Sequence, residues 1–575
     1  MKSLFSSHIF MFPFRFDWND KGFEKEFEFY KSIDEHLEKR IDLQGLHQQL
    51  TKQNLWSYKE FQIEEQKEKH LFYSEYTYFY DYARDAIYNQ SKVFDPQAIS
   101  HFYCREDFYQ KGKIFRLKTQ KREEAYELEI DNVSLRVFQT GVAILAIELK
   151  NNNYPDFQDI LNINDFGRRV YPQFISKTNQ TVPSEYMQGV KGAFLADSIE
   201  IGEFQETFNY KDFSDTKIGE HIMKLLGGEI FSQNKQELSR FYIQPSLDDR
   251  MFVLSWYGNS AKASQLQDKK SLYKSSDDWY QYLFVDNNGA TVQNQKMKKS
   301  LLKHGTYDRW SNYKTLYGIS RYSCVLLTDA SKFSKDKLRV DLETMYFQMM
   351  ILLLAIRTSV LRFSDEVAAL ASSVELDADK LTQLYQRYLV FYNRLYFKEV
   401  THQDQGIELY NLARKQMTID EHIEKLDSKF TKLFEFAELQ ARKRQEKLEK
   451  ERLIIEKEAD AKQSAKMDKL TIMGAIFLPP SLMIAWFSMG IFEYEQSETS
   501  LYIAVISIVI SVLLTISFIN YKEKANKIKE MILPAIVITI ITMLMALIPI
   551  KLIGEKKNKV NDVNITNSVL KIKNE

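Results

Sequence analysis

The long apolar runs of this 575-residue chain all lie at its C-terminal end, and they constrain its fold more than any other feature. Three runs approach the ~20 apolar residues needed to cross a bilayer, namely Leu470–Phe492, Leu501–Asn520 and Met531–Ile550. None of them contains a charged side chain, although 27% of the residues in the whole chain are charged. We therefore predict a soluble N-terminal part, residues 1–469, followed by a membrane domain.

A shorter apolar run, Met345–Ile356, lies within the soluble part and is bracketed by Glu343 and Arg357. About a dozen residues are too few to span a bilayer as a helix. We interpret this run as a buried helix of the soluble domain.

Lysines around the apolar runs predict their orientation. Three lysines precede the first run within residues 462–469 and four follow the second within residues 522–529, whereas the acidic loop 493–498 has none. Because positive charge favours the cytoplasmic side, we expect residues 1–469 inside and the acidic loop outside. Lysines also follow the third run, so it either spans the membrane against this rule or lies in or re-enters it. We favour a third span.

The start of the chain and its cysteines indicate the compartment. Arg15 and Asp17 follow only a few apolar residues, and no small-residue cleavage site is present, so no signal peptide is predicted. Cys104 and Cys324 are the two cysteines, and two isolated thiols fit a reducing cytoplasm. We expect a multi-pass protein of the inner (cytoplasmic) membrane with most of its residues in the cytoplasm.

Composition and motifs argue against several classes of function. Lysine plus arginine and aspartate plus glutamate both total 78, so bulk charge gives no basis for binding a nucleic-acid duplex. The motifs GxxxxGK(S/T), GxGxxG, HExxH, GxSxG and CxxC are absent, and the nine histidines show no metal-ligand spacing. We predict no catalytic residues, no enzymatic activity and no organic cofactor.

Residues 1–340 have the pattern of an α+β domain, which we predict to be a cytoplasmic sensor domain. Four β-rich runs predict an antiparallel meander with turns at Asp131–Asn132 and Thr140–Gly141. These runs are Ile114–Leu117, Tyr126–Ile130, Ser134–Gln139 and Val142–Leu149. Further candidates are an N-terminal strand, the strands Met251–Tyr257 and Tyr322–Leu327, and the charged helix Lys21–Leu50.

Residues 341–469 have a helical pattern and form the predicted stalk. A heptad-like seam of apolar residues consists of Ile419, Ile423, Leu426, Phe430, Leu433 and Ala437. Charged helix formers continue without Gly or Pro as far as Gly474, so one helix is expected to enter the first apolar run. From Thr418 to Phe492 it would be roughly 110 Å long. The seam predicts packing against copies of the chain; the alternative is a monomeric helix with a solvated charged face.

The first apolar run carries a recognisable spacing. Its matching residues are Leu470, Thr471, Ile476, Phe477 and Pro479, in the order LTxxxxIFxP, and the loop behind it carries Glu493, Glu495 and Glu498. Arriving at the end of a long charged helix, this segment resembles the first membrane span of the CorA/ZntB-type divalent-cation transporters. In that family the run leads to a Gly-Met-Asn tripeptide at the outer mouth, then to an acidic loop and a second span. The resemblance covers about residues 420–520.

Two features depart from this family. The tripeptide reads Ser488, Met489 and Gly490, so the asparagine whose amide would face a hydrated ion is missing. The chain also has a third apolar run and a larger cytoplasmic domain. The resemblance therefore implies membership of the superfamily without implying magnesium selectivity.

The resemblance implies a homo-oligomer, a pentamer in that family, set in membrane lipid with a divalent cation as permeant or regulatory ion. Its first span would line the pore, and helical periodicity independently directs one face of this span toward an axis. The predicted lining residues are Ser464, Met467, Leu470, Gly474, Leu478, Ser481, Ala485 and Met489. Met467 and Leu470 coincide with the family's hydrophobic constriction, which closes a pore by dewetting. Ordinary helix packing is the alternative for each residue alone.

Both ends of this face carry candidate ion contacts. The predicted outer mouth consists of Ser488, Gly490, Glu493, Glu495 and Glu498. Asp460 and Asp468 lie near the inner mouth, where a ring of carboxylates concentrates cations or binds a regulatory one.

The large soluble part raises the question of what it senses. Some CorA-like proteins encoded beside type III CRISPR systems are membrane effectors triggered by a nucleotide second messenger, and the aromatic-rich soluble part resembles these. Arg168 and Arg169 behind a glycine are a candidate phosphate contact. The alternative, which we favour, is a surface ion pair with Asp165 or Asp159.

The function predicted from the sequence is an oligomeric, CorA-like cation channel gated by its cytoplasmic domain through a small ligand such as a nucleotide second messenger, in antiviral defence. The alternatives are a housekeeping transporter of magnesium or another divalent cation, and a membrane-disrupting signalling protein without ion selectivity. The predicted order is a sensor domain (1–340), a helical stalk (341–469), an all-α pore domain with two to three transmembrane helices (470–553) and a tail (554–575).

Overall fold

The computed structural model describes most of the chain up to residue 488. The described residues are 4–19, 41–52, 55–62, 69–108, 113–119, 122–170, 174–175, 180–182, 196–207, 211–212, 218–234, 236–247, 250–267, 271–287, 289–372, 376, 378–488, 502, 505–506, 509–510, 512–513 and 537. Most of the second and third apolar runs, the tail 554–575 and most of the helical candidate Lys21–Leu50 therefore lie outside them. Two compact units, residues 1–440 and 441–575, are described separately.

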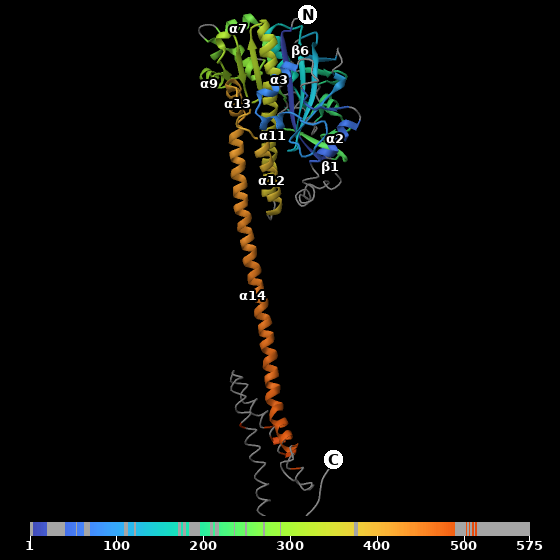
Figure 1. Cartoon of the computed structure of the whole chain (residues 1–575), viewed down its shortest axis with the longest axis vertical. Coiled ribbons are helices and arrows are strands. Elements are labelled where there is room, and N and C mark those ends of the chain that lie inside the picture. The colour runs from blue at the N-terminus through green and yellow to red at the C-terminus, as the bar shows by residue number, and fades with distance from the viewer. Residues whose placement is uncertain are drawn as a thin grey trace, which may run out of the picture. The chain divides into compact units, whose positions relative to one another are not determined.

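A 14-stranded sheet forms the framework of the first unit (Figure 1). Its main path runs β10-β9-β4-β5-β6-β1-β14-β17-β16-β15, while β2 and β3 branch from β5, and β12 and β13 branch from β1. The pairs β14–β17 and β12–β13 are parallel, and the others are antiparallel.

The strands have the following bounds: β1 Ser6–Asn19, β2 Ser57–Tyr58, β3 Ser100–Cys104, β4 Ile114–Thr119, β5 Tyr126–Phe138, β6 Val142–Asn151, β9 Ala196–Ile201, β10 Phe204–Thr207, β12 Phe231–Ser232, β13 Arg240–Pro245, β14 Phe252–Gly258, β15 Thr306–Tyr307, β16 Leu316–Ile319 and β17 Ser323–Thr328. A separate three-stranded sheet contains β7 Phe174–Ile175, β8 Gln180–Val182 and β11 Lys211–Asp212.

Strand β1 is the central strand, and a proline marks where it changes partner. Residues 6–11 pair with β14, residues 14–19 pair with β13, and β6 pairs along the other edge. Pro13 lies at the change, where its lack of an N–H costs no hydrogen bond to either neighbour. Its carbonyl accepts a hydrogen bond from the Ser246 N–H at 3.0 Å.

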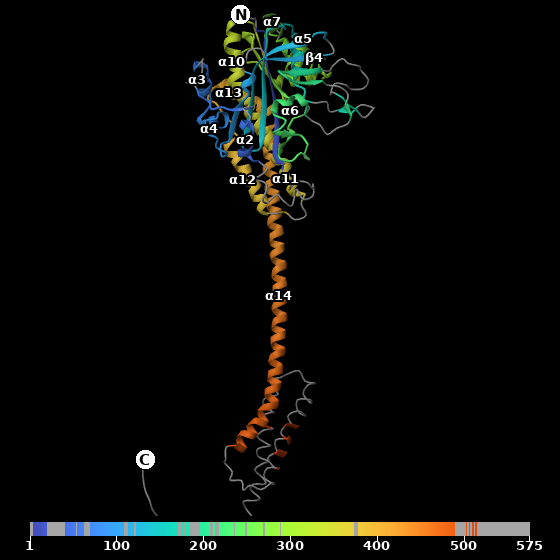
Figure 2. The ribbon, with the colours of Figure 1, turned by 90° about the vertical axis from the view of Figure 1, so that its right-hand side faces the viewer.

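Alternation along β1 divides the core into two layers. Ile9 and Met11 pack in the cluster that contains helix α11 (Phe347–Ala371), whereas four alternating phenylalanines of β1 pack in the cluster that contains helix α5 (Phe157–Gly167). This is the period of two expected for a strand that is buried on both faces. Figure 2 shows α5 and α6 (Glu220–Leu226) on one side of the strands and α12 (Ala378–Arg394) and α13 (Asp404–Gln416) on the other.

The predicted meander is correct in part. Its turn at Thr140–Gly141 is confirmed, since Gly141 has a φ of +76° and its N–H bonds the Phe138 carbonyl at 3.0 Å. The turn predicted at Asp131–Asn132 is wrong, because β5 continues through it with a register shift between Ile130 and Asn132. Asp131 forms a bulge in one long strand, and a bulge uses the same residue types as a turn.

The remaining helices of the first unit are α2 Leu43–Lys52, α3 Lys69–Tyr78, α4 Asp81–Ile87, α7 Ser260–Leu266, α8 Asp277–Phe284, α9 Gln295–Gly305, α12 Ala378–Arg394 and α13 Asp404–Gln416. Helical turns at Ser334–Leu338, Arg339–Asp341 (α10) and Leu342–Tyr346 lead without a break into α11.

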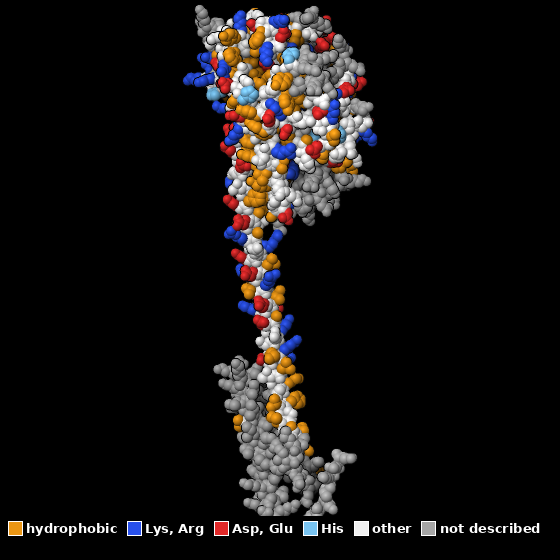
Figure 3. Space-filling model, in the orientation of Figure 1, with side chains coloured by type: hydrophobic (Ala, Val, Ile, Leu, Met, Phe, Trp, Pro, Cys, Tyr) orange, Lys and Arg blue, Asp and Glu red, His pale blue; other side chains and the backbone are white. Residues whose placement is uncertain are grey.

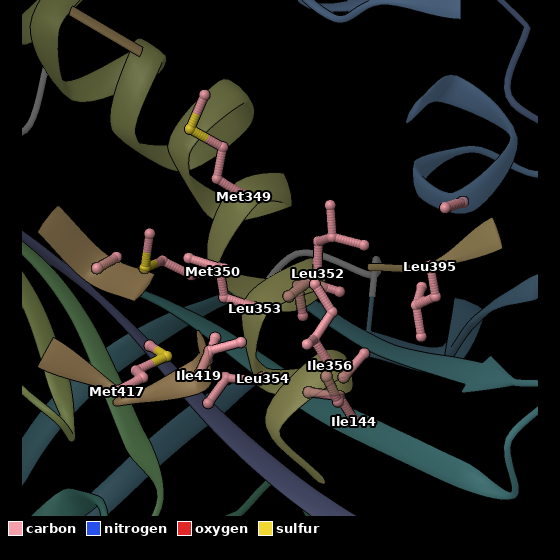
Figure 4. Close-up of a cluster of buried hydrophobic side chains, with 14 of the residues drawn as sticks. Ile144, Met349, Met350, Leu352, Leu353, Leu354, Ile356, Leu395, Met417 and Ile419 are labelled. Carbon is pink, nitrogen blue, oxygen red and sulfur yellow. The ribbon is translucent and has the colours of Figure 1, made fainter. Parts of the chain in front are cut away.

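The run Met345–Ile356 is a buried core helix, as predicted. It covers the end of the turn Leu342–Tyr346 and the first ten residues of α11, and Figure 4 shows its side chains packed against Ile144, Leu395, Met417 and Ile419. Among the described residues, Ser334–Ala371 is the one helix long and apolar enough to cross a membrane, and 83% of its most apolar window is buried inside the protein. Its apolarity is therefore explained by the core.

Helix α14 extends from Ile419 to Ser488 and begins in the first unit. Four seam residues, Ile419, Ile423, Leu426 and Phe430, are at most 3% exposed. The ring of Phe430 lies 5.0 Å from that of Tyr388 and 5.1 Å from that of Tyr385, both on α12. The partner of the seam is thus the core of the same chain, and the seam gives no argument for a second copy.

The predicted fold is confirmed at the level of an N-terminal domain of sheet and helices followed by a helical region. The two to three membrane helices stay a prediction.

Candidate functional site

The predicted pore-lining residues can be placed along α14 except at its end. Seven of them, Ser464, Met467, Leu470, Gly474, Leu478, Ser481 and Ala485, are exposed positions of the helix, and Met489 lies outside the described residues. Asp460 and Asp468, the predicted inner mouth, are exposed positions of the same helix. Ser488 is its last residue, and Gly490, Glu493, Glu495 and Glu498 lie outside the described part. These assignments stay predictions.

The last part of α14 exposes large apolar side chains. Met467, Leu470, Met473, Phe477, Leu478, Leu482 and Ile484 are between 47 and 67% exposed. Figure 3 shows charged side chains of both signs along the middle of α14 and hydrophobic side chains toward its end. An apolar surface of this extent in water marks an interface with lipid or with protein.

Arg168 and Arg169 are buried rather than presented at the surface. Both are at most 6% exposed, and their Nη2 atoms donate to Oδ1 of Asp165 at 3.1 and 3.0 Å. Arg168 also donates to the carbonyl of Val285 at 2.9 Å. Burial opposes ionisation of Asp165, but the two arginines hold its carboxyl pKa below the usual value. The ion pair with Asp165 that we favoured is present, and it is buried.

A cluster of basic side chains lies at the start of α14, where three segments meet. Arg321 comes from the turn between β16 and β17, Arg357 from the middle of α11, and His422 from the first turn of α14. We call these three residues the basic cluster. Arg357 is 7% exposed, whereas Arg321 is exposed and His422 half-buried.

Hydrogen bonds hold the basic cluster together through uncharged groups. Nη1 of Arg357 donates to the Arg321 carbonyl at 3.0 Å, and its guanidinium carbon lies 5.5 Å from the centre of the Tyr322 ring. Nη2 of Arg321 donates weakly to Oγ1 of Thr418 at 3.5 Å. The Nε of Arg357 is buried and has no hydrogen-bond partner in the described structure.

Among the described residues, no carboxylate forms an ion pair with any of the three members of the basic cluster. Burial and then the charge of Arg321 lower the pKa of Arg357. Burial, then Arg321, Arg357 and Lys425, lower the pKa of His422, while the neighbouring Glu421 raises it.

The backbone at this point adds to the positive potential. Thr418 has a φ of +55°, and its hydroxyl donates to the Met417 carbonyl at 2.7 Å instead of capping the first turn of α14. The N-terminus of a helix carries a partial positive charge on its free N–H groups. Asp420 in this turn is already paired with Arg414 at 2.5 Å.

This cluster was not predicted from the sequence. Arg357 served there only as the end of an apolar run, and no role was expected for Arg321 or His422. The available signal was a charged side chain directly behind twelve residues of apolar core helix, a position that must be buried or must end the helix. The helix continues to Ala371, so Arg357 is buried.

Both cysteines lie in the core and take no part in these sites. Cys104 and Cys324 are free and buried, and burial, the largest cause for both, raises the pKa of each thiol to about 12. Neither thiol is therefore ionised or reactive at neutral pH. No group of three or more His, Cys, Asp or Glu side chains that could hold a metal ion occurs within the described ranges.

Comparison with known proteins gave no relative: no protein-family model, curated protein or solved structure matches the chain.

Proposed function

We propose that this protein is an oligomeric, CorA-like cation channel of the cytoplasmic membrane, in which the N-terminal domain controls the pore through α14. The observation that carries the proposal is that a single helix is packed in the core at Ile423 and Phe430 and exposes an apolar surface around Leu470. A displacement of its packed start is transmitted along a continuous helix, because no hinge of coil interrupts it.

The apolar end of α14 supports a membrane role for the second unit. Its exposed side chains around Leu470 and Phe477 would be stabilised by lipid or by neighbouring copies of the helix. Membrane helices place charge inside the bilayer only at high cost, and the run Leu470–Phe492 contains none. A pore lined by such residues is closed by dewetting and opened by widening.

Two parts of the proposal rest on the resemblance of residues 420–520. The resemblance alone supports a cation as the permeant ion and a pentamer as the assembly. Because Gly490 stands where the family has asparagine, the proposal names no particular cation. A small ligand such as a nucleotide second messenger, in antiviral defence, is proposed as the trigger of the N-terminal domain.

Ion flux into liposomes tests the function. Purified full-length protein is reconstituted, and the uptake of monovalent and divalent cations is followed with and without candidate nucleotides. We expect Leu470→Asp to give a constitutive leak, because a charged ring hydrates a hydrophobic constriction. Met473→Asp is the matched control, since Met473 is 59% exposed against 63% for Leu470 but lies off the predicted lining face.

The outcomes separate the competing functions. Selective cation flux supports the channel, and flux that is triggered by nucleotide supports the sensor role. Release of large dyes together with ions supports a membrane-disrupting protein instead. If no cation passes under any condition, the channel proposal is wrong.

A further inference from the structure

Within the first unit, Arg357 is buried without the charged partner that buried arginines normally have. An arginine keeps its proton at any physiological pH, so it cannot escape burial by becoming neutral. Its contacts here are the Arg321 carbonyl and the Tyr322 side chain, and its buried Nε has no hydrogen-bond partner among the described residues. A second cation, Arg321, and the imidazole of His422 lie near it, and no carboxylate of the described residues pairs with it.

Another arginine of the same helix shows what a structural guanidinium looks like in this protein. Arg362 is 2% exposed, and it donates to Asp17 at 2.6 Å and to Glu366 at 2.9 Å. Its remaining N–H groups bond the carbonyls of Phe16 and Gly141, both at 2.9 Å. Arg357 in the basic cluster is buried to a similar extent as Arg362, but no carboxylate of the described residues pairs with it.

We propose that the basic cluster, Arg321, Arg357 and His422 at the start of α14, is a binding site for the phosphate group of a small molecule. The guanidinium fork matches the oxygens of a phosphate, and the cluster brings two such forks and an imidazole together from three elements of the fold. The N-terminus of α14 lies in the same place, where the Thr418 hydroxyl donates to the Met417 carbonyl, and the positive end of a helix favours an anion.

Binding at this place would add a charged link between three elements that already pack in one hydrophobic core. A phosphate held by Arg321, Arg357 and His422 joins the β16–β17 turn, α11 and α14 in one charge-assisted network. If the proposed channel function holds, this is the site where ligand binding shifts the position of α14. The binding proposal itself does not depend on that function.

Calorimetric titration of the full-length protein with pyrophosphate, at constant ionic strength, tests the site. We expect saturable binding to the wild-type protein, and a loss of affinity of at least tenfold in Arg357→Met and in Arg321→Met. Lys432→Met is the matched control, because Lys432 is an exposed cation of the same helix outside the cluster, and its affinity should stay within twofold.

The arrangement of variants makes the result decisive. Equal affinity in Arg357→Met and wild type would overturn the proposal, as would an equal loss in Lys432→Met, which would indicate non-specific attraction. The fold of each variant is checked by its thermal transition, and Arg357→Lys serves as a second variant that keeps the charge but loses the fork. Absence of saturable binding to the wild type also overturns the site.

Two further experiments identify the source of the phosphate and test the binding site separately from the channel function. Titrations in nanodiscs of phosphatidylcholine and of phosphatidylglycerol distinguish a soluble phosphate from a lipid headgroup, since only a headgroup competes with pyrophosphate in an Arg357-dependent way. Binding without liposome flux would contradict the channel alone. Flux without binding would contradict this site alone.

Discussion

Arg357 and Arg362 occupy the same helix, α11, and are buried to a similar extent, yet they have opposite surroundings. Arg362 lies between Asp17 and Glu366, and although burial opposes its charge, the two carboxylates raise its pKa above the usual value. Arg357 faces Arg321 and has its pKa lowered by burial and by that charge. Carboxylates therefore neutralise the positive charge of Arg362, whereas no carboxylate of the described residues pairs with Arg357.

The carboxylates around Arg362 indicate that this arginine is structural, and their absence from the described surroundings of Arg357 indicates that Arg357 is not. Removing one partner of a buried ion pair leaves the other charge uncompensated. Removing a charge that has no opposite partner leaves no buried charge uncompensated. Natural proteins keep an unpaired buried charge where function requires it, because stability alone selects against it. The two arginines therefore predict opposite responses to the same substitution.

Arg362→Met gives the largest expected effect. It removes the cation that bridges Asp17 and Glu366, whose side chains are 17 and 14% exposed, although Glu366 keeps its ion pair with Arg387. It also removes a donor from the carbonyls of Phe16 and Gly141. We expect the free energy of unfolding to fall by about 3–5 kcal/mol. Urea unfolding of the full-length protein, followed by tryptophan fluorescence, measures the change. A loss under about 1 kcal/mol would remove the contrast between the two arginines.

A buried carboxyl group that contacts α11 from another helix extends the comparison to pH. Glu75 of α3 is 4% exposed and accepts hydrogen bonds from Tyr88 and from Gln348 of α11, both at 3.1 Å. Burial, partly offset by these bonds and by Arg136, raises its pKa from 4.5 to about 7. Unlike Arg357, this group can lose its charge near neutral pH.

The sign of the resulting pH dependence follows from the raised pKa. The folded protein favours the protonated acid, so this contribution to stability is fully present below pH 4.5 and is lost as the pH rises through about 7. It amounts to about 3 kcal/mol at 1.36 kcal/mol per pKa unit. Unfolding curves of wild type and Glu75→Gln at several pH values measure it as a difference. Parallel profiles of the two proteins would show that Glu75 is already ionised in the fold.

The sequence predicted those parts of this architecture that depend on periodicity. The buried first strand, the strands around residues 251–257 and 322–327, and the core helix over Met345–Ile356 follow from runs of apolar residues, and the structure contains β1, β14, β17 and α11 at these places. It predicted the seam of α14 from Ile419 to Ala437 but assigned it to the wrong partner. A helix seam specifies that a partner exists, whereas the choice between α12 and a second copy depends on how the chain folds back.

Sequence periodicity could not predict the basic cluster, because its members come from three distant segments of the chain. Arg321 and Arg357 are 36 positions apart, and His422 lies on another helix. Arg168 and Arg169, which are adjacent in sequence, attracted the phosphate hypothesis and are found paired with Asp165. Adjacency in sequence indicates local charge, but whether that charge is already neutralised depends on tertiary contacts.

Arg357→Met is expected to give the smallest change in stability, and that small value is the informative one. Methionine fills a similar space and leaves no carboxylate unpaired, since no described acid contacts Arg357. Removing its charge also relieves the repulsion with Arg321, which offsets the loss of the hydrogen bond to the Arg321 carbonyl. We expect the free energy of unfolding to change by less than about 1 kcal/mol in either direction. The same urea titration as for Arg362→Met measures it. A loss of similar size in both variants would assign Arg357 to the fold, whereas a stable variant that no longer binds pyrophosphate would assign it to a ligand.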